Sequence, residues 1–155
     1  MNFYVPTDKE LLAAFGELTL RHEHLNHILR MTIKTLAQLE ITEALDATAY
    51  ESSSELRRRI NKLARQRLGE GKPLLQLQAL LERCKRATDM RNEYVHSVWA
   101  QELDGEPARQ SSDNNWQPLP TTPELKGLGT EILDLTRALN HARLEGFLVE
   151  ALAGR

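Results

Sequence analysis

A long run of apolar residues at helical spacing, from about Pro73 to about Glu102, most constrains the fold of this chain. The apolar positions recur every three or four residues, which is the period of one face of an α-helix. The pattern therefore predicts a long amphipathic helix that packs against other helices. Its predicted inward face consists of Leu77, Leu80, Cys84, Thr88, Arg91, Val95 and Val98.

Arg91 places a permanent positive charge near the end of this otherwise apolar face. A guanidinium in such a position needs an acid, an anion or water as its partner. His96 follows five residues later, and histidine is the side chain that most readily exchanges a proton near neutral pH. Five helical residues turn through about 500°, so Arg91 and His96 point about 140° apart. The two side chains can therefore meet only in a groove or across a two-fold axis between two subunits.

Capping signals predict two helices before this one. The first begins at a capping box, Thr7-Asp8-Lys9-Glu10, with the Thr7 oxygen as the cap, and extends to about Leu39. A short helix capped by Thr42 follows and ends at about Thr48. The apolar face of the first helix consists of Leu11, Phe15, Leu18, Leu25, Ile28, Leu29, Ile33 and Leu36.

Two further helices are predicted by the same signals. A second capping box at residues 52–55 opens a helix that ends at about Leu68, and Thr122 followed by Pro123 opens a last helix that ends at about Leu152. Their predicted inward residues are Leu56, Ile60, Leu63, Ala64 and Leu68 in the earlier helix, and Leu125, Leu128, Ile132, Leu135, Leu139, Ala142 and Phe147 in the later one.

These elements predict one all-α domain over residues 1–155. The composition, 41% hydrophobic, 27% charged and 5% aromatic, suits a helical protein better than a sheet protein. We expect an antiparallel up-and-down bundle of four long helices and one short helix. An irregular segment, about 103–121, precedes the last helix, and a short hairpin within it would bury Trp116.

The chain offers no signal for a membrane or for an oxidising compartment. No apolar run approaches the roughly 20 residues that a membrane span requires, and residues 1–6 lack the basic and apolar regions of a signal peptide. The single cysteine, Cys84, lies on the apolar face and is expected to be a core residue. We therefore expect a cytoplasmic protein. The formal net charge of -2 gives no global attraction to nucleic acid, so any such attraction must be local.

The third predicted helix carries a concentrated row of positive charge. Six basic residues lie between positions 57 and 67 with no acid among them. One interpretation is a surface that contacts the phosphate backbone of RNA, and the other is a solvated face that pairs with acids on neighbouring helices. The residues expected to contact RNA are Arg57, Arg58, Lys62 and Arg65.

The middle of the first helix contains three histidines and one glutamate between His22 and His27. A metal site is one interpretation, but the spacing matches no zinc motif, so we predict neither a metal nor another cofactor. A second interpretation is that Glu23 or His27 lines the same cleft as Arg91. The third is a face exposed to solvent or to another subunit.

Arg91 and Asn92, followed by His96 late in the fourth helix, resemble the signature of the HEPN superfamily. That signature is an arginine, an adjacent polar residue and a histidine four to six residues after the arginine. The predicted order of helices is also similar to that of compact bacterial HEPN proteins, and the resemblance covers nearly the whole chain. It implies a metal-independent endoribonuclease that forms a homodimer through the motif helix. A toxin in a toxin–antitoxin or defence system, partnered by an antitoxin protein, is a further implication.

The resemblance also implies roles for these residues. His96 would act as general acid or base for attack of a ribose 2′-hydroxyl on the adjacent phosphate. Arg91 would stabilise charge in the transition state, and Asn92 would orient His96 or the phosphate. Glu93 is close enough in helical spacing to hold the protonated imidazole.

Two alternatives to an enzyme remain open at this point. A non-catalytic HEPN module would bind RNA, a nucleotide or a partner protein without cutting it. A purely structural helical protein would instead pair Arg91 with a buried acid such as Glu23.

Overall fold

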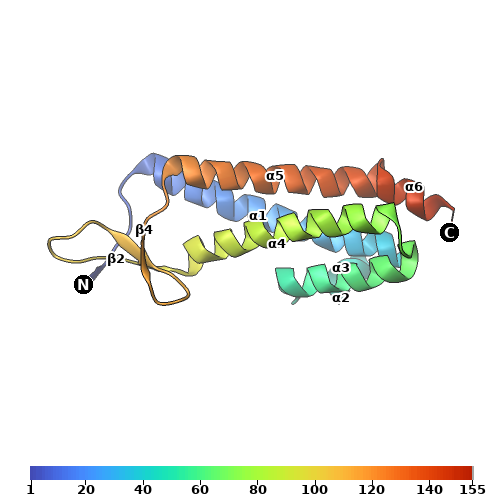
Figure 1. Ribbon diagram of the computed structural model, residues 1–155, viewed down its shortest axis with the longest axis horizontal. Coiled ribbons are helices and arrows are strands. Elements are labelled where there is room, and N and C mark those ends of the chain that lie inside the picture. Colours follow the sequence, from blue (N-terminus) through green and yellow to red (C-terminus); the bar gives the residue numbers. More distant parts are fainter. Residues whose placement is uncertain (155) are drawn as a thin grey trace.

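Figure 1 shows a computed structural model of the chain, in which residues 1–154 are described. Most of these residues are helical, which confirms the mostly helical character that the sequence predicts. The helices are α1 (Lys9–Ala37), α2 (Ile41–Ala47), α3 (Ser53–Leu68), α4 (Lys72–His96), α5 (Thr122–Leu144) and α6 (Phe147–Ala153).

The long helices lie side by side around one apolar core. α1 packs most extensively against α5 and also contacts α3, while α4 packs against α3 and α5. In Figure 1, α4 runs in the opposite direction to α1, α3 and α5, so α1 and α5 are parallel neighbours. The predicted apolar faces of α1, α3 and α5 supply most of the core. Its largest fully buried side chains are Leu18, Leu25, Leu29, Ile33, Leu36, Leu56, Ile60, Leu74, Leu77, Leu125, Ile132 and Leu135.

A small antiparallel sheet at one end of the helices corrects the all-α prediction (Figure 1). Much of segment 103–121 lies outside regular secondary structure, but two strands form within it and a third precedes it. The hairpin expected there is present as β3 and β4, yet Trp116 is 47% exposed, so burial of this side chain does not explain it. In spatial order the strands are β1 (Asn2–Phe3), β2 (Val98–Gln101), β3 (Ala108–Gln110) and β4 (Trp116–Pro118).

The motif helix α4 ends at His96, six residues before the predicted end at Glu102. Ser97 adopts an extended backbone conformation, and its hydroxyl donates to the Glu93 carbonyl, which closes the last turn. The Trp99 indole then donates to the Tyr94 carbonyl at 3.2 Å. Apolar spacing alone suggests that the helix continues to Val98, but β-branched and aromatic residues also favour a strand.

Contacts between the helices and the sheet fix the change from helix to strand after His96. The ring of Trp99 meets Phe15 of α1 edge to face, with the ring centroids 5.4 Å apart. The Trp99 carbonyl also accepts a hydrogen bond of 2.8 Å from the Tyr4 backbone N–H. The start of the sheet is therefore anchored to the first helix on one side and to the N-terminal segment on the other.

The cap of α1 differs from the prediction. The Asp8 carboxylate, rather than the Thr7 hydroxyl, accepts from the backbone N–H groups of Glu10 at 2.9 Å and Leu11 at 3.3 Å. Both residue types are good caps, but aspartate also brings a negative charge to the positive end of the helix dipole. The helix consequently begins at Lys9.

The N-caps of α2 and α5 also differ from the predicted residues, whereas the N-cap of α3 agrees with the prediction. Glu40, not Thr42, forms the capping box of α2, and Thr121, not Thr122, forms that of α5. Ser52 caps α3 as predicted, because its hydroxyl accepts from Glu55 N–H at 3.2 Å.

The predicted last helix is interrupted near Gly146, which separates α5 from α6. The backbone N–H groups of Glu145 and Gly146 both bond to the His141 carbonyl, at 2.8 and 2.9 Å. A Cβ on Gly146 would lie 3.1 Å from the Ala142 Cα and from the His141 ring. The tight turn therefore accommodates glycine and leaves no room for a larger residue without a local shift.

Replacing Asp8 by alanine should lower the free energy of unfolding by about 1 kcal/mol, because two N–H groups of α1 lose their acceptor. Thr7→Ala is the matched control and should change stability by only a few tenths of that amount. Urea unfolding followed by circular dichroism measures both. A larger loss for Thr7→Ala than for Asp8→Ala would contradict the observed cap.

Candidate functional site

Arg91 lines a polar cavity of about 320 Å³ where α1 and α4 meet the start of α3. We call it the arginine cavity. The three helices come together here because their apolar faces share the core immediately beside it. Its lining residues are His22, Glu23, Asn26, Glu51, Ser52, Ser53, Ser54, Arg57, Thr88, Asp89, Arg91 and Asn92.

The arginine cavity contains buried hydrogen-bonding nitrogens that have no partner. Among the described residues these include Arg57 Nη1, Arg91 Nε and His22 Nδ1. Arg91 Nη1 does have a partner, the Asn92 side-chain oxygen at 3.1 Å. No ion pair joins Arg91 to Glu23 within residues 1–154, although both line the cavity. Unpartnered polar groups in a buried position are costly, so this cavity is suited to a ligand with several acceptor oxygens.

His22 is the buried histidine of α1 and was not singled out by the sequence pattern. Its side chain is 3% exposed, and its Nε2 lies 3.1 Å from the Thr88 hydroxyl. Burial, and then the charges of Arg91 and Arg57, lower the pKa of His22 to about 4. The ring is therefore neutral at pH 7. The available signal was its spacing, because His22 lies between Leu18 and Leu25 on the apolar face of α1.

Two arginines and three acids line the arginine cavity, but two of the acids are held by cations outside its lining. Glu51 is paired with Arg59, and Asp89 accepts from Lys85 at 2.8 Å. These pairs leave Arg57 and Arg91 opposed by the exposed Glu23 alone. The N-terminus of α3 adds the partial positive charge of its free N–H groups.

His96 lies in a second polar cavity, of about 230 Å³, between the end of α4 and the loop that joins β3 to β4. We call it the histidine cavity. Its lining residues are Asn92, Glu93, His96, Ser97, Val98, Gln110, Ser111, Ser112 and Asn114. Asn92 lines both cavities, whereas Arg91 and His96 line different ones. The structure thus places the motif residues side by side but does not bring Arg91 and His96 into one cavity.

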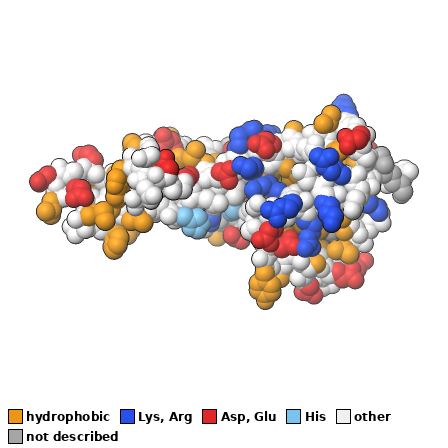
Figure 2. All heavy atoms as spheres, turned by 60° about the horizontal axis from the view of Figure 1, so that its bottom comes forward, with side chains coloured by type: hydrophobic (Ala, Val, Ile, Leu, Met, Phe, Trp, Pro, Cys, Tyr) orange, Lys and Arg blue, Asp and Glu red, His pale blue; other side chains and the backbone are white. Residues whose placement is uncertain are grey.

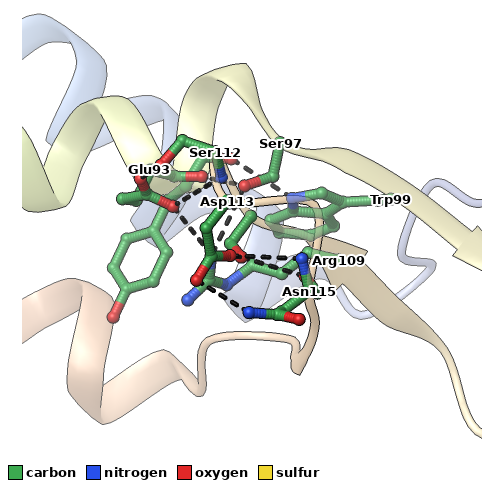
Figure 3. A network of polar contacts seen from close by, with 9 residues as sticks. Glu93, Ser97, Trp99, Arg109, Ser112, Asp113 and Asn115 are labelled. Atoms are coloured by element: carbon green, nitrogen blue, oxygen red, sulfur yellow. Dashed lines mark hydrogen bonds and ion pairs between the residues drawn. The ribbon is translucent and has the colours of Figure 1, made fainter.

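Glu93 fastens the β3–β4 loop to α4 (Figure 3). Its carboxylate accepts from the Ser112 hydroxyl and backbone N–H and from Arg109 Nη1 at 3.5 Å. The hydrogen bond from Ser112 and the charge of Arg109 hold the pKa of Glu93 below its usual value. The guanidinium of Arg109 also lies 5.2 Å from the centre of the Tyr94 ring. Glu93 therefore has its own partners and builds one wall of the histidine cavity.

The tip of the same loop is ordered by local hydrogen bonds (Figure 3). The Asp113 carboxylate accepts from the Ser111 hydroxyl, from the Asn115 backbone at 3.1 Å and from its side chain at 2.8 Å. Asn114 takes a left-handed conformation with φ of 66°, which asparagine tolerates better than most residues. The loop thereby presents Ser111 and Ser112 to the histidine cavity.

The basic row of α3 divides among different environments. Arg57 alone of the predicted RNA contacts enters the arginine cavity, while Arg58 and Lys62 line a separate hollow between α1 and α3. Arg65 lies 3.9 Å from Glu70. Figure 2 shows Lys and Arg side chains gathered over the helical part of one face, with acids among them, and few at the sheet end. The row therefore combines inward, paired and exposed cations.

The remaining predictions concern Glu23, His27, a metal site, a membrane span and Cys84. Glu23 lines the arginine cavity, whereas His27 is exposed on α1 and lines neither cavity. In the described part of the chain, no group of three His, Cys, Asp or Glu side chains is arranged to hold a metal ion. Nor does any helix there combine the length and apolar character needed to cross a membrane. Cys84 is buried in the core as predicted.

Comparison with known proteins gives no relative: no protein-family model, curated protein or solved structure matches this chain.

The lowered pKa of His22 should make stability depend on pH. Between pH 7 and pH 5 the unfolded chain binds a proton at this position and the folded chain does not, so the free energy of unfolding should fall by about 2 kcal/mol. Urea unfolding at the two pH values measures this loss. In His22→Gln the loss should largely disappear, whereas His24→Gln, at an exposed position of α1, should retain it. Equal losses in the wild type and in His22→Gln would contradict a buried neutral His22.

Proposed function

We propose that this chain is a metal-independent endoribonuclease of the HEPN type that acts as a cytoplasmic homodimer. In this proposal the helices form a HEPN-like bundle. The observation that carries the proposal is the position of Asn92, which lines both the cavity of Arg91 and the cavity of His96. An RNA backbone that follows α4 across Asn92 would meet an unpaired guanidinium on one side and an exposed imidazole on the other.

The proposed reaction needs only groups that this chain supplies. His96 accepts the proton of a ribose 2′-hydroxyl, and the 2′-oxygen attacks the adjacent phosphorus. The bond from phosphorus to the 5′-oxygen then breaks, and the 5′-oxygen takes the proton from the protonated His96, which restores the neutral imidazole. The products are a 2′,3′-cyclic phosphate and a 5′-hydroxyl end. Arg91 stabilises the negative charge on the phosphate oxygens in the transition state, while Asn92 positions Arg91 through their hydrogen bond.

Arg91 and His96 line different cavities within one chain. A homodimer through α4 would bring an Arg91 and a His96 close to the same phosphate. A second α4 beside the first would let the reacting phosphate contact one Arg91 and one His96, from the same chain or from both. Met90 and Val98, on either side of the motif, are 45% and 42% exposed. Burial of such apolar side chains would favour association of two copies.

The resemblance to HEPN proteins also motivates a biological setting for this activity. We propose that the chain is the toxin of a toxin–antitoxin or defence system and that an antitoxin protein restrains it. A nucleotidyltransferase-like protein encoded in the neighbouring reading frame would support this part of the proposal.

A second candidate function is RNA binding without cleavage. The observation in its favour is that Arg91 and His96 line different cavities within one chain. In addition, Glu93 is held by Ser112 and Arg109 rather than by the imidazole of His96. Under this alternative, Arg57 and Arg91 bind phosphate groups and His96 has no chemical role.

Incubation of the purified protein with mixed RNA in EDTA separates the two candidates. The wild type should cut RNA and leave 2′,3′-cyclic phosphate or 3′-phosphate ends. His96→Ala should lose activity by about 100-fold or more, because general acid–base catalysis contributes at least that much. His24→Ala, at an exposed histidine of α1 that lines neither cavity, is the matched control and should cut like the wild type.

Circular dichroism establishes that each variant is folded. Cleavage by His96→Ala at the wild-type rate would rule out the role assigned to His96. Absence of cleavage by the folded wild type, together with salt-sensitive RNA binding, would favour the second candidate.

A further inference from the structure

The arginine cavity has the features of a binding site that lies beside the reaction centre at His96. Its donors come from three different helices: His22 from α1, Arg57 from α3 and Arg91 from α4. Each of these side chains has one buried nitrogen without a partner. Donors that converge from several directions match a tetrahedral group with three or four acceptor oxygens.

The start of α3 adds to this arrangement. Ser52 uses its hydroxyl to cap Glu55 N–H, and the Ser53 hydroxyl donates to the Asn26 side chain at 2.6 Å. The backbone N–H groups of Ser53 and Ser54 lie in the first turn, where a helix has no internal acceptors for them. The open end of a 16-residue helix therefore meets the cavity, and such an end favours an anion.

His22 is the independent sign that a ligand belongs here. Its side chain is buried, with only 3% exposed, and its Nδ1 has no hydrogen-bond partner. The Thr88 hydroxyl lies 3.1 Å from Nε2 and can donate to it. In the tautomer in which Thr88 donates to Nε2, the neutral ring carries its proton on Nδ1 and needs an acceptor there. A third cation, beside Arg57 and Arg91, would be unfavourable at this position, whereas a neutral N–H donor is not.

We propose that the arginine cavity is a phosphate-binding subsite, held by Arg57, Arg91, His22 and the N-terminus of α3, which adjoins the reaction centre at His96 and shares Arg91 with it. The ligand is the phosphate group of a nucleotide or of RNA. The cavity volume of about 320 Å³ exceeds the size of a single phosphate and leaves room for part of an attached sugar. Arg91 links the two sites, because it lines the subsite while its Nη1 bonds to Asn92 on the shared wall.

Phosphate binding here goes beyond the proposed function, because it requires no cleavage. It also gives Arg57 a role different from that of the outer basic residues of α3. A phosphate held in this subsite would fix the position of the neighbouring nucleotides relative to His96.

Titration of the full chain with inorganic phosphate at pH 7 and constant ionic strength tests the subsite. Nuclear magnetic resonance should show saturable shifts for the ring of His22 and for the Ser53 and Ser54 amides. Arg57→Gln should weaken the apparent affinity about tenfold or more, because it removes a charged donor. Arg67→Gln makes the same change of charge on the same helix, away from both cavities, and should stay within about twofold of the wild type.

A second arm distinguishes the sources of the phosphate. Short RNAs with 2′-O-methyl groups, which cannot be cut through a 2′-hydroxyl, are compared with and without a 5′-phosphate. Tighter binding of the 5′-phosphorylated RNA, sensitive to Arg57→Gln, assigns the subsite to a terminal phosphate. Equal binding of both, with the same sensitivity, assigns it to an internal phosphodiester.

Three outcomes would overturn the subsite: no saturable shift in the wild type with either probe, equal weakening by Arg57→Gln and Arg67→Gln, or shifts confined to residues outside the cavity. These outcomes are independent of the cleavage assay. A protein that cuts RNA without binding phosphate at Arg57 loses only the subsite, and a protein that binds phosphate without cutting loses only the nuclease.

Discussion

The arrangement of the site depends on two guanidinium groups that the fold holds partly buried without matching acids. Arg57 and Arg91 reach the same cavity from α3 and α4, and the acids nearest to them are either paired with other cations or exposed. Two like charges in a partly buried place repel each other and lose hydration. The third polar group, His22, adds no further positive charge at pH 7, because its burial and the two guanidinium groups lower its pKa. Such an arrangement favours a bound anion, and the proposed phosphate group would supply the negative charge.

The rest of the structure positions this cavity beside the one that contains His96. The apolar faces of α1, α3 and α4 share one core, so the polar ends of those faces meet at a fixed place. The change from helix to strand after His96 then brings the β3–β4 loop back over the end of α4. Glu93 holds that loop through Ser112 and Arg109. A single wall residue, Asn92, consequently separates a cavity suited to phosphate from one that contains an exposed imidazole.

Much of the helical structure could be predicted because each amphipathic helix repeats its signal over many turns. Apart from the β3–β4 hairpin, the sheet could not be predicted, because its strands are two to four residues long and it pairs residues distant in the chain, such as Phe3 with Ala100. The capping residues were harder to predict than the helices. Thr7 and Asp8 can both cap a helix, and only the folded geometry shows that Asp8 caps α1. Similarly, apolar spacing extended α4 past His96, where the hydrogen bonds of Ser97 and Trp99 end it.

The residues of the candidate site also differ in how far the sequence alone could predict them. Arg91, Asn92 and His96 were found from a local motif within one helix, and Glu23 from its closeness to the histidine-rich segment. His22 was overlooked because a polar residue on an apolar face looks like an interruption until its partner, Thr88, is known. Arg57 was one of six similar cations, and only the meeting of α3 with α1 and α4 shows that it turns inward. Contacts between distant segments decide these cases, and no local pattern contains them.

We propose that RNA lies along α4, with its phosphates in the arginine cavity and its reacting ribose at His96. The most direct measurement is a crystal structure of the protein with a short RNA that carries 2′-O-methyl groups. We expect a phosphate within hydrogen-bond distance of Arg57 and Arg91 and a ribose 2′-oxygen beside His96. An RNA bound only to the outer row, at Arg58 and Lys62, with both cavities free of it, would contradict the account.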